Sequence, residues 1–161
     1  MRLNQSVPSN EVKHKGYLSL QPGTARVLSV VALGCLHLGS VLSFALPKGL
    51  SWATLITSGL SLVGMLVAVI MFLCSYSFIA NAPEGWIDER ELTERNAAYL
   101  RALQYVVVMI LVGLLVLEVA SRFLSHQFTA EEFTKYLNVL FFSSMIMPAC
   151  LLAWRDQPVV D

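Results

Sequence analysis

The side chains with the greatest chemical potential are ionisable groups inside the apolar stretches of this 161-residue chain. His37 lies near the middle of the uncharged run 27–47. A charged imidazole is costly at the centre of a membrane span, so it is either neutral or faces a polar interior. Such residues commonly relay protons or bind ligands. No second histidine shares the span, and two roles stay open for His37: a hydrogen-bonded structural group, which we favour, and a functional group.

Glu118 and Arg122 form a second candidate group at the end of another apolar run. They are four residues apart with the glutamate first, which favours an ion pair along one face of a helix. Near the membrane surface the pair is structural, and both side chains reach toward water. Deeper in the bilayer, Glu118 could bind a cation or a proton. We favour the paired, structural role.

Small residues recur at helical spacing in two apolar runs and predict close helix packing. Helices in lipid associate through van der Waals contact and interhelical hydrogen bonds, which small side chains permit. The face could pack within one chain, which we favour, or form the interface of a homo-oligomer. Its residues are Thr57, Ser61, Gly64 and Ala68 in one run and Gly39 and Ser43 in another.

The segment from Asp88 to Gln104 carries closely spaced charges of both signs. Arg90 with Glu94, and Glu91 with Arg95, are spaced for ion pairs along a helix surface. Such a surface is usually solvated, but it could also dock a cytoplasmic partner or a neighbouring subunit. Candidate partner-contact residues are Asp88, Arg90, Glu91, Glu94 and Arg95.

This segment, in which Asp88, Glu89 and Arg90 lead directly into a long apolar helix, resembles the juxtamembrane segments of small uncharacterised four-span bacterial inner-membrane proteins. The resemblance covers the residues from Asp88 to Gln104. It implies a location in a bacterial inner membrane and implies no activity.

The elements that must position these residues follow from composition. Hydrophobic residues make up 56% of the chain and charged residues only 14%, against about 25% charged in soluble domains. The charges leave long uncharged runs, and a bilayer core about 30 Å thick needs about 20 apolar helical residues. Four spans fit, with no room for a separate catalytic domain. The uncharged runs are 27–47, 49–83, 102–117 and 136–154.

We predict an all-α, antiparallel four-helix transmembrane bundle. Two helices should begin outside the lipid, because Asp88 with Glu91 and Thr129 with Glu132 have the spacing of capping boxes. The third helix should therefore extend into the cytoplasm as a helix over 88–101. The predicted domains are a flexible cytoplasmic segment 1–24, a membrane domain 25–154 with spans 26–46, 53–78, 102–122 and 136–154, and a cytoplasmic tail 155–161.

The basic residues predict the orientation, because lysine and arginine favour the cytoplasmic side. Eight of the eleven fall on one side of the predicted spans, which places both termini and the charged segment in the cytoplasm. These eight are Arg2, Lys13, Lys15, Arg26, Arg90, Arg95, Arg101 and Arg155. The other three are Lys48, Arg122 and Lys135.

Other functional classes are disfavoured. The net charge is zero, so no overall field attracts nucleic acid. Cys35, Cys74 and Cys150 lack the close spacing of a disulfide framework or a zinc site. The sequence has no glycine-rich phosphate loop, nucleophile elbow or paired-histidine metal motif. We therefore expect no enzyme, no catalytic or metal-binding residue and no cofactor.

The sequence favours a non-enzymatic multi-pass inner-membrane protein that acts as an accessory or interaction component. Its expected partners are the lipid bilayer and either a second copy or another membrane protein. One alternative is a small transporter or channel subunit that oligomerises around His37, Ser40 and Ser143. Another is an immunity protein against a pore-forming toxin, a role that suits four spans and short loops.

Overall fold

Four long helices make up most of the computed structural model, which describes residues 17–46, 50–123 and 129–155. They are α2 (Pro22–Ala45), α3 (Ser51–Phe72), α5 (Glu89–Phe123) and α6 (Ala130–Arg155). Each is long and apolar enough to cross a membrane. A short helix α4 (Ser75–Asn81) and the 3₁₀ turn η1 (Glu84–Trp86) join α3 to α5. The prediction of an all-helical chain with four long apolar helices is confirmed for the described residues.

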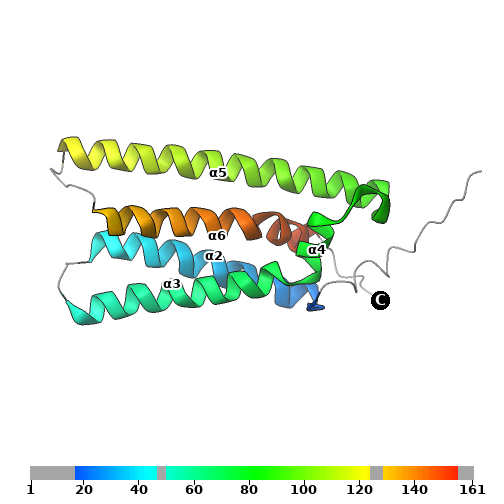
Figure 1. Cartoon of the computed structure of the whole chain (residues 1–161), viewed down its shortest axis with the longest axis horizontal. Helices are drawn as coiled ribbons and strands as arrows, with labels where there is room; N and C mark the ends of the chain where they lie inside the picture. Colours follow the sequence, from blue (N-terminus) through cyan, green and yellow to red (C-terminus); the bar gives the residue numbers. More distant parts are fainter. Residues whose placement is uncertain (1–16, 47–49, 124–128, 156–161) are drawn as a thin grey trace, which may run out of the picture.

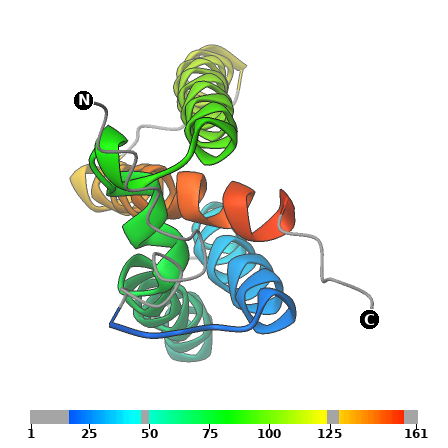
Figure 2. The same cartoon turned by 90° about the vertical axis from the view of Figure 1, so that its right-hand side faces the viewer.

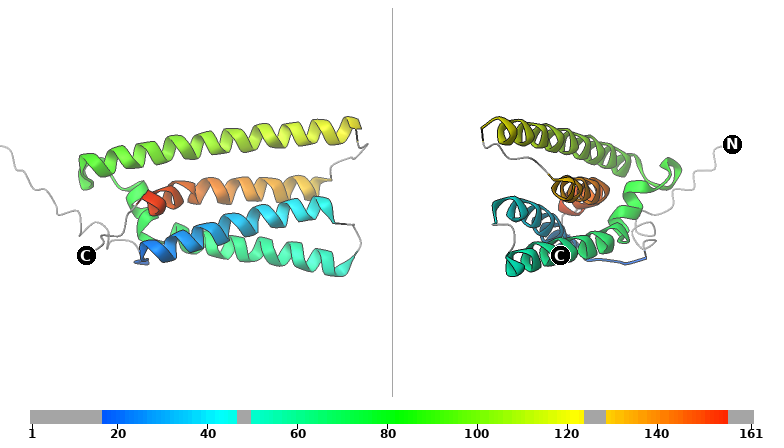
Figure 3. Two further views of the ribbon diagram at one scale, coloured as in Figure 1. Left: turned by 180° about the vertical axis from the view of Figure 1, so that it is seen from behind. Right: turned by 60° about the vertical axis from the view of Figure 1, so that its left-hand side comes forward.

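The four long helices lie side by side, with α6 between α5 and the α2–α3 pair (Figures 1 and 2). Helix α2 packs against α3 and α6, whereas α5 packs mainly against α6. Figure 3 shows the same order from behind. Helix α6 is accordingly the most buried of the four. Within its most apolar 18-residue stretch, 44% of the residues are buried by the rest of the chain, whereas the corresponding share for α5 is 11%.

Small residues bring the backbones of α2 and α3 into contact at two points. A Cβ atom on Gly64 would lie 2.8 Å from Leu36 Cγ and 2.9 Å from the Leu36 backbone nitrogen. A Cβ atom on Gly39 would lie 2.8 Å from Ser61 Oγ. Real Cβ atoms do not approach a backbone atom this closely, so glycine is required at Gly64, whereas at Gly39 an added Cβ atom would displace the Ser61 hydroxyl. Ala32 and Ala68 are buried in the same contact.

The start of α2 is tied to the end of α6. Arg26 Nε donates a hydrogen bond of 3.1 Å to the backbone oxygen of Ala153. The Arg26 guanidinium also lies 5.8 Å from the ring centre of Trp154, a distance that suits a cation–π contact. These contacts join distant parts of the chain at the end of the molecule where α5 begins (Figure 1).

Both predicted capping boxes are confirmed as helix starts. Asp88 Oδ1 accepts a hydrogen bond of 2.6 Å from the Glu91 backbone nitrogen, directly before α5. Before α6, the Thr129 backbone nitrogen donates to Glu132 Oε2 at 2.8 Å, and the Glu132 nitrogen donates to Thr129 Oγ1 at 3.3 Å. Helix α5 then continues unbroken for 35 residues, about 50 Å, which exceeds the thickness of a bilayer core.

The predicted second span, 53–78, is wrong at its end, because α3 stops at Phe72 and a separate helix begins at Ser75. An extended segment from before α2 causes the break. The Leu18 nitrogen donates to the Leu73 oxygen at 3.3 Å, and the Ser75 nitrogen donates to the Leu18 oxygen at 3.0 Å. This parallel bridge diverts backbone groups that a continuous helix would need. The residues of α4 are uncharged and most of them are buried, so the absence of charges continues past the break.

The predicted flexible segment 1–24 is also too long. Helix α2 begins at Pro22, a residue type suited to a helix start because the first turn needs no donor there. Leu18 lies in the bridge just described. Residues 1–16 of that predicted segment, and residues 156–161 of the predicted tail, lie outside the described part of the chain.

Gly64→Ala should destabilise the protein by about 1–3 kcal/mol, because the added methyl group overlaps Leu36 and forces α2 and α3 apart. The matched control is Gly59→Ala in the same helix, where a Cβ atom would meet nothing within 4 Å. That change should leave stability unchanged or raise it by up to about 1 kcal/mol. Unfolding in mixed detergent micelles measures both, and equal effects would contradict the proposed close contact.

Candidate functional site

A polar cluster inside the helix bundle brings together side chains from three helices. His37 Nδ1 lies 2.7 Å from the Leu33 backbone oxygen, one turn earlier in α2. His37 Nε2 lies 2.6 Å from the hydroxyl oxygen of Tyr105 in α5. The two rings meet edge to face, with centres 6.1 Å apart. The histidine therefore links α2 to α5, two helices that otherwise make little contact.

The partners of His37 indicate which tautomer a neutral imidazole adopts. A carbonyl oxygen only accepts, so Nδ1 must carry the proton that it donates to Leu33. In a neutral imidazole Nε2 is then an acceptor, and the Tyr105 hydroxyl donates to it. Both ring nitrogens are thus satisfied without a charge, which a bilayer interior favours. This arrangement suits the structural role that the sequence favoured for His37.

Ser143 of α6 lies on the other side of Tyr105. Its hydroxyl is beside the phenol, its side chain is fully buried, and its oxygen forms no hydrogen bond of standard geometry with the described residues. A Tyr hydroxyl that donates to histidine still has lone pairs that can accept. A small rotation of the Ser143 hydroxyl toward Tyr105 would extend the cluster from α2 through α5 to α6.

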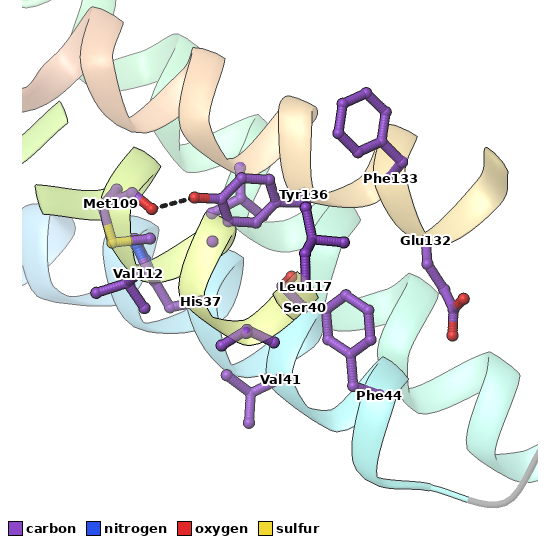
Figure 4. A pocket seen from close by; sticks show the side chains of 13 residues that line it. His37, Ser40, Val41, Phe44, Met109, Val112, Leu117, Glu132, Phe133 and Tyr136 are labelled. Atoms are coloured by element: carbon purple, nitrogen blue, oxygen red, sulfur yellow. Dashed lines mark hydrogen bonds between the residues drawn. The ribbon is translucent and has the colours of Figure 1, made fainter. Parts of the chain in front are cut away.

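A pocket of about 310 Å³ opens beside this cluster, between α2, α5 and α6 (Figure 4). Its polar groups are few. The Tyr136 hydroxyl donates to the Met109 backbone oxygen, and the Tyr136 ring lies against Gly113, where any side chain would collide with it. The lining residues are His37, Ser40, Val41, Phe44, Met109, Val112, Gly113, Val116, Leu117, Glu132, Phe133, Tyr136 and Val139.

Glu118 and Arg122 do not join this cluster. The two side chains form an ion pair with each other on α5, and they are 57% and 71% exposed, respectively. Neither is among the residues that line the pocket. The pair therefore has the i to i+4 ion-pair geometry that the sequence predicted.

The predicted helix-packing residues make two kinds of contact. Gly39, Ser61 and Gly64 lie where α2 meets α3, and Ala68 is buried there. Thr57 also lies at this contact, because its backbone oxygen would be 3.3 Å from a Cβ atom on Gly39. The hydroxyls of Thr57, Ser61 and Ser43 all donate within their own helices. Thr57 Oγ1 donates to the Ala53 oxygen at 3.1 Å, and Ser43 Oγ donates to the Ser40 oxygen at 2.7 Å. The closest approaches on this face are thus made within one chain.

Arg95 of the charged segment is largely internal. Its side chain is only 11% exposed, donates to the Ala82 oxygen at 2.5 Å and lies 3.6 Å from a Glu84 carboxylate oxygen. Tyr99 adds a hydrogen bond of 3.0 Å to Asn81. These contacts hold the start of α5 against the connection from α4, so Arg95 is less suited to a partner contact than the sequence suggested.

Arg90 remains on the surface. Its side chain is 85% exposed, and it pairs with Glu94 at 3.2 Å. Asp88 is engaged as the cap of α5, and Glu91 completes that cap through its backbone nitrogen. The charged segment therefore presents Arg90 and Glu94 outward, while its other candidate residues stabilise the start of the helix.

Tyr105 and Tyr136 are the two pocket-side residues that sequence reasoning missed. Each is a phenol in or next to one of the uncharged runs, and a buried tyrosine hydroxyl usually needs a partner. That rule could have drawn attention to them, but their partners lie on other helices. Within the described residues, no group of three or more histidine, cysteine, aspartate or glutamate side chains could hold a metal ion.

Tyr105→Phe should destabilise the fold by about 1–3 kcal/mol, because it leaves His37 Nε2 without a donor inside the bundle. Tyr99→Phe is the matched control, since it removes an exposed hydroxyl from the same helix and should change stability by less than about 0.5 kcal/mol. Unfolding in detergent micelles compares the two. Equal losses would show that the His37–Tyr105 bond contributes nothing specific.

Comparison of the chain with protein-family models, with curated proteins and with solved structures finds no match. No activity, ligand or partner can therefore be transferred from a relative. The role of the protein has to be inferred from its own helices, the His37–Tyr105–Ser143 cluster and the adjacent pocket.

Proposed function

We propose that the chain is a multi-pass protein of a bacterial inner membrane, with both termini and the start of α5 in the cytoplasm. The starts of α2 and α5 and the end of α6 lie at one end of the molecule (Figure 1). These helix ends carry Arg26, Arg90, Arg95, Arg101 and Arg155. Because arginine and lysine concentrate on the cytoplasmic side, their gathering at one end supports this orientation.

Reporter fusions test the orientation. An enzyme that is active only in the cytoplasm should be active when fused after Asp161 and inactive when inserted at Thr129. A reporter that is active only outside the inner membrane should give the opposite pattern. An external carboxyl terminus would contradict the proposal and move the charged start of α5 to the outer side.

Within this membrane we propose a binding role, as an accessory or interaction component without catalytic activity or a cofactor. The observation that carries the proposal is the peripheral position of α5, whose most apolar window is only 11% buried by the rest of the chain. Helix–helix association in lipid relies on close packing, and the wide outer face of α5 is available for it. Packing between α2, α3 and α6 would persist while α5 engaged a partner.

The outer face of α5 also differs along its length, which would give a partner two kinds of contact. Its charged first turns, with Arg90 and Glu94, precede the apolar stretch and would lie in water or among headgroups. Exposed leucines follow toward the middle of the membrane. They are Leu100, Leu103, Leu111, Leu114 and Leu115. A partner membrane protein with complementary juxtamembrane charges would match both parts.

Photocrosslinking in native membranes tests this role. A photoreactive amino acid at Leu103 or Leu111 of α5 should join the chain to one discrete membrane protein. The matched controls are Leu55 and Leu62 of α3, which are equally apolar and exposed. These positions should react only with lipid.

The identity of the captured protein decides between narrower roles. If the captured protein is a second copy of the chain, the protein acts as a homo-oligomer. If it is a pore-forming toxin, the chain is an immunity protein. Reaction of the α5 positions with lipid alone, as for the α3 controls, would contradict the binding role.

A further inference from the structure

The pocket between α2, α5 and α6 is long and narrow in the direction of the helices. It follows α2 from His37 to Phe44 and α6 from Glu132 to Val139, in each case about 10 Å at 1.5 Å per residue. Its deep end is the His37–Tyr105 hydrogen bond, near the middle of the span. Its other end reaches Glu132, in the first turn of α6.

Three of the polar side chains that line this pocket, those of His37, Tyr136 and Glu132, are already engaged within the protein. His37 uses both ring nitrogens, and the Tyr136 hydroxyl donates to the Met109 backbone oxygen. At the outer end, Glu132 accepts hydrogen bonds from Thr129. Water enters a cavity only where it finds several polar partners, so the lining of this pocket suits an apolar occupant better than water.

The side of the pocket opens toward the surroundings of the helices. The lining residues Val41, Val112 and Val116 are 61%, 46% and 47% exposed, respectively, although they face the pocket. Both α2 and α5 are candidate membrane spans, and they make little contact along this stretch. In a membrane the opening therefore faces hydrocarbon chains and not water.

We propose that this pocket binds one acyl chain of a phospholipid, from the leaflet next to the α5–α6 connection. A volume of about 310 Å³ accommodates about ten methylene groups, if each takes about the 30 Å³ of a water molecule. A chain of that length extends from the membrane surface toward the middle, as the pocket does. The Tyr136 ring forms one wall of the pocket. Its hydroxyl is bonded to the Met109 backbone oxygen, and the ring occupies the space that a side chain at residue 113 would fill.

The test uses the full chain in vesicles of phosphatidylethanolamine and phosphatidylglycerol that contain a phospholipid with a diazirine in its acyl chain. Irradiation followed by peptide mass spectrometry should locate the label on residues 37–44 and 109–117. Labelling should saturate at one lipid per chain. A parallel arm replaces the phospholipid with a free fatty acid that carries the same diazirine.

Two matched double variants locate the site. Val41→Phe with Val116→Phe fills the pocket and should lower labelling of these peptides about tenfold. Val30→Phe with Val108→Phe makes the same changes at exposed positions of the same helices that do not line the pocket, and it should leave labelling unchanged. Circular dichroism checks folding, and each single pocket variant repeats the test if the double variant unfolds.

Three results would overturn the proposal. The first is labelling spread over all exposed apolar faces. The second is an equal loss in the two double variants. The third is saturable labelling of the pocket by the free fatty acid but not by the phospholipid, which would show a site for a free amphiphile.

Discussion

The close contact between α2 and α3 is the constraint on which the rest of the molecule depends. Apolar side chains gain little from leaving lipid for one another, so helices in a bilayer are held by packing and by polar contacts. At Gly64 the backbones come too close for any side chain to fit, and at Gly39 the approach is nearly as tight. This contact forms a rigid pair of helices against which α6 can pack.

Helix α6 packs against the α2–α3 pair and connects it to the other helices. It contacts α2, α3, α4 and α5, and its inner face buries small and medium residues such as Ser143, Ile146 and Ala149. The bond from Arg26 to the Ala153 oxygen closes one end of this unit of α2, α3 and α6. Helix α5 is held at the edge of this unit by α6, by the His37–Tyr105 bond and by the Arg95 contacts. Its position at the edge explains both its exposed outer face and the pocket on its inner side.

Much of the fold could be read from local sequence. Four apolar runs produced four long helices, and the capping boxes at Asp88 and Thr129 gave the starts of α5 and α6. The break at Leu73 could not be read in this way, because the residues on both sides are uncharged and the partner of the broken segment is Leu18, far away in sequence. Hydropathy indicates which segments are apolar, but it does not indicate which backbone groups form hydrogen bonds with a distant segment.

The candidate site shows the same division more sharply. The sequence by itself determined that His37 lies within an apolar helix and that small residues share a face of α3, and it predicted that eight of the eleven basic residues fall on one side of the spans. Only the tertiary structure decided that Tyr105 is the partner of His37, that Arg95 is held internally, and that a pocket lies between α2, α5 and α6. Caps, periodicity and hydropathy depend on residues within a few helical turns. Pairings between helices depend on their relative rotation and separation, which the packing of the whole chain sets.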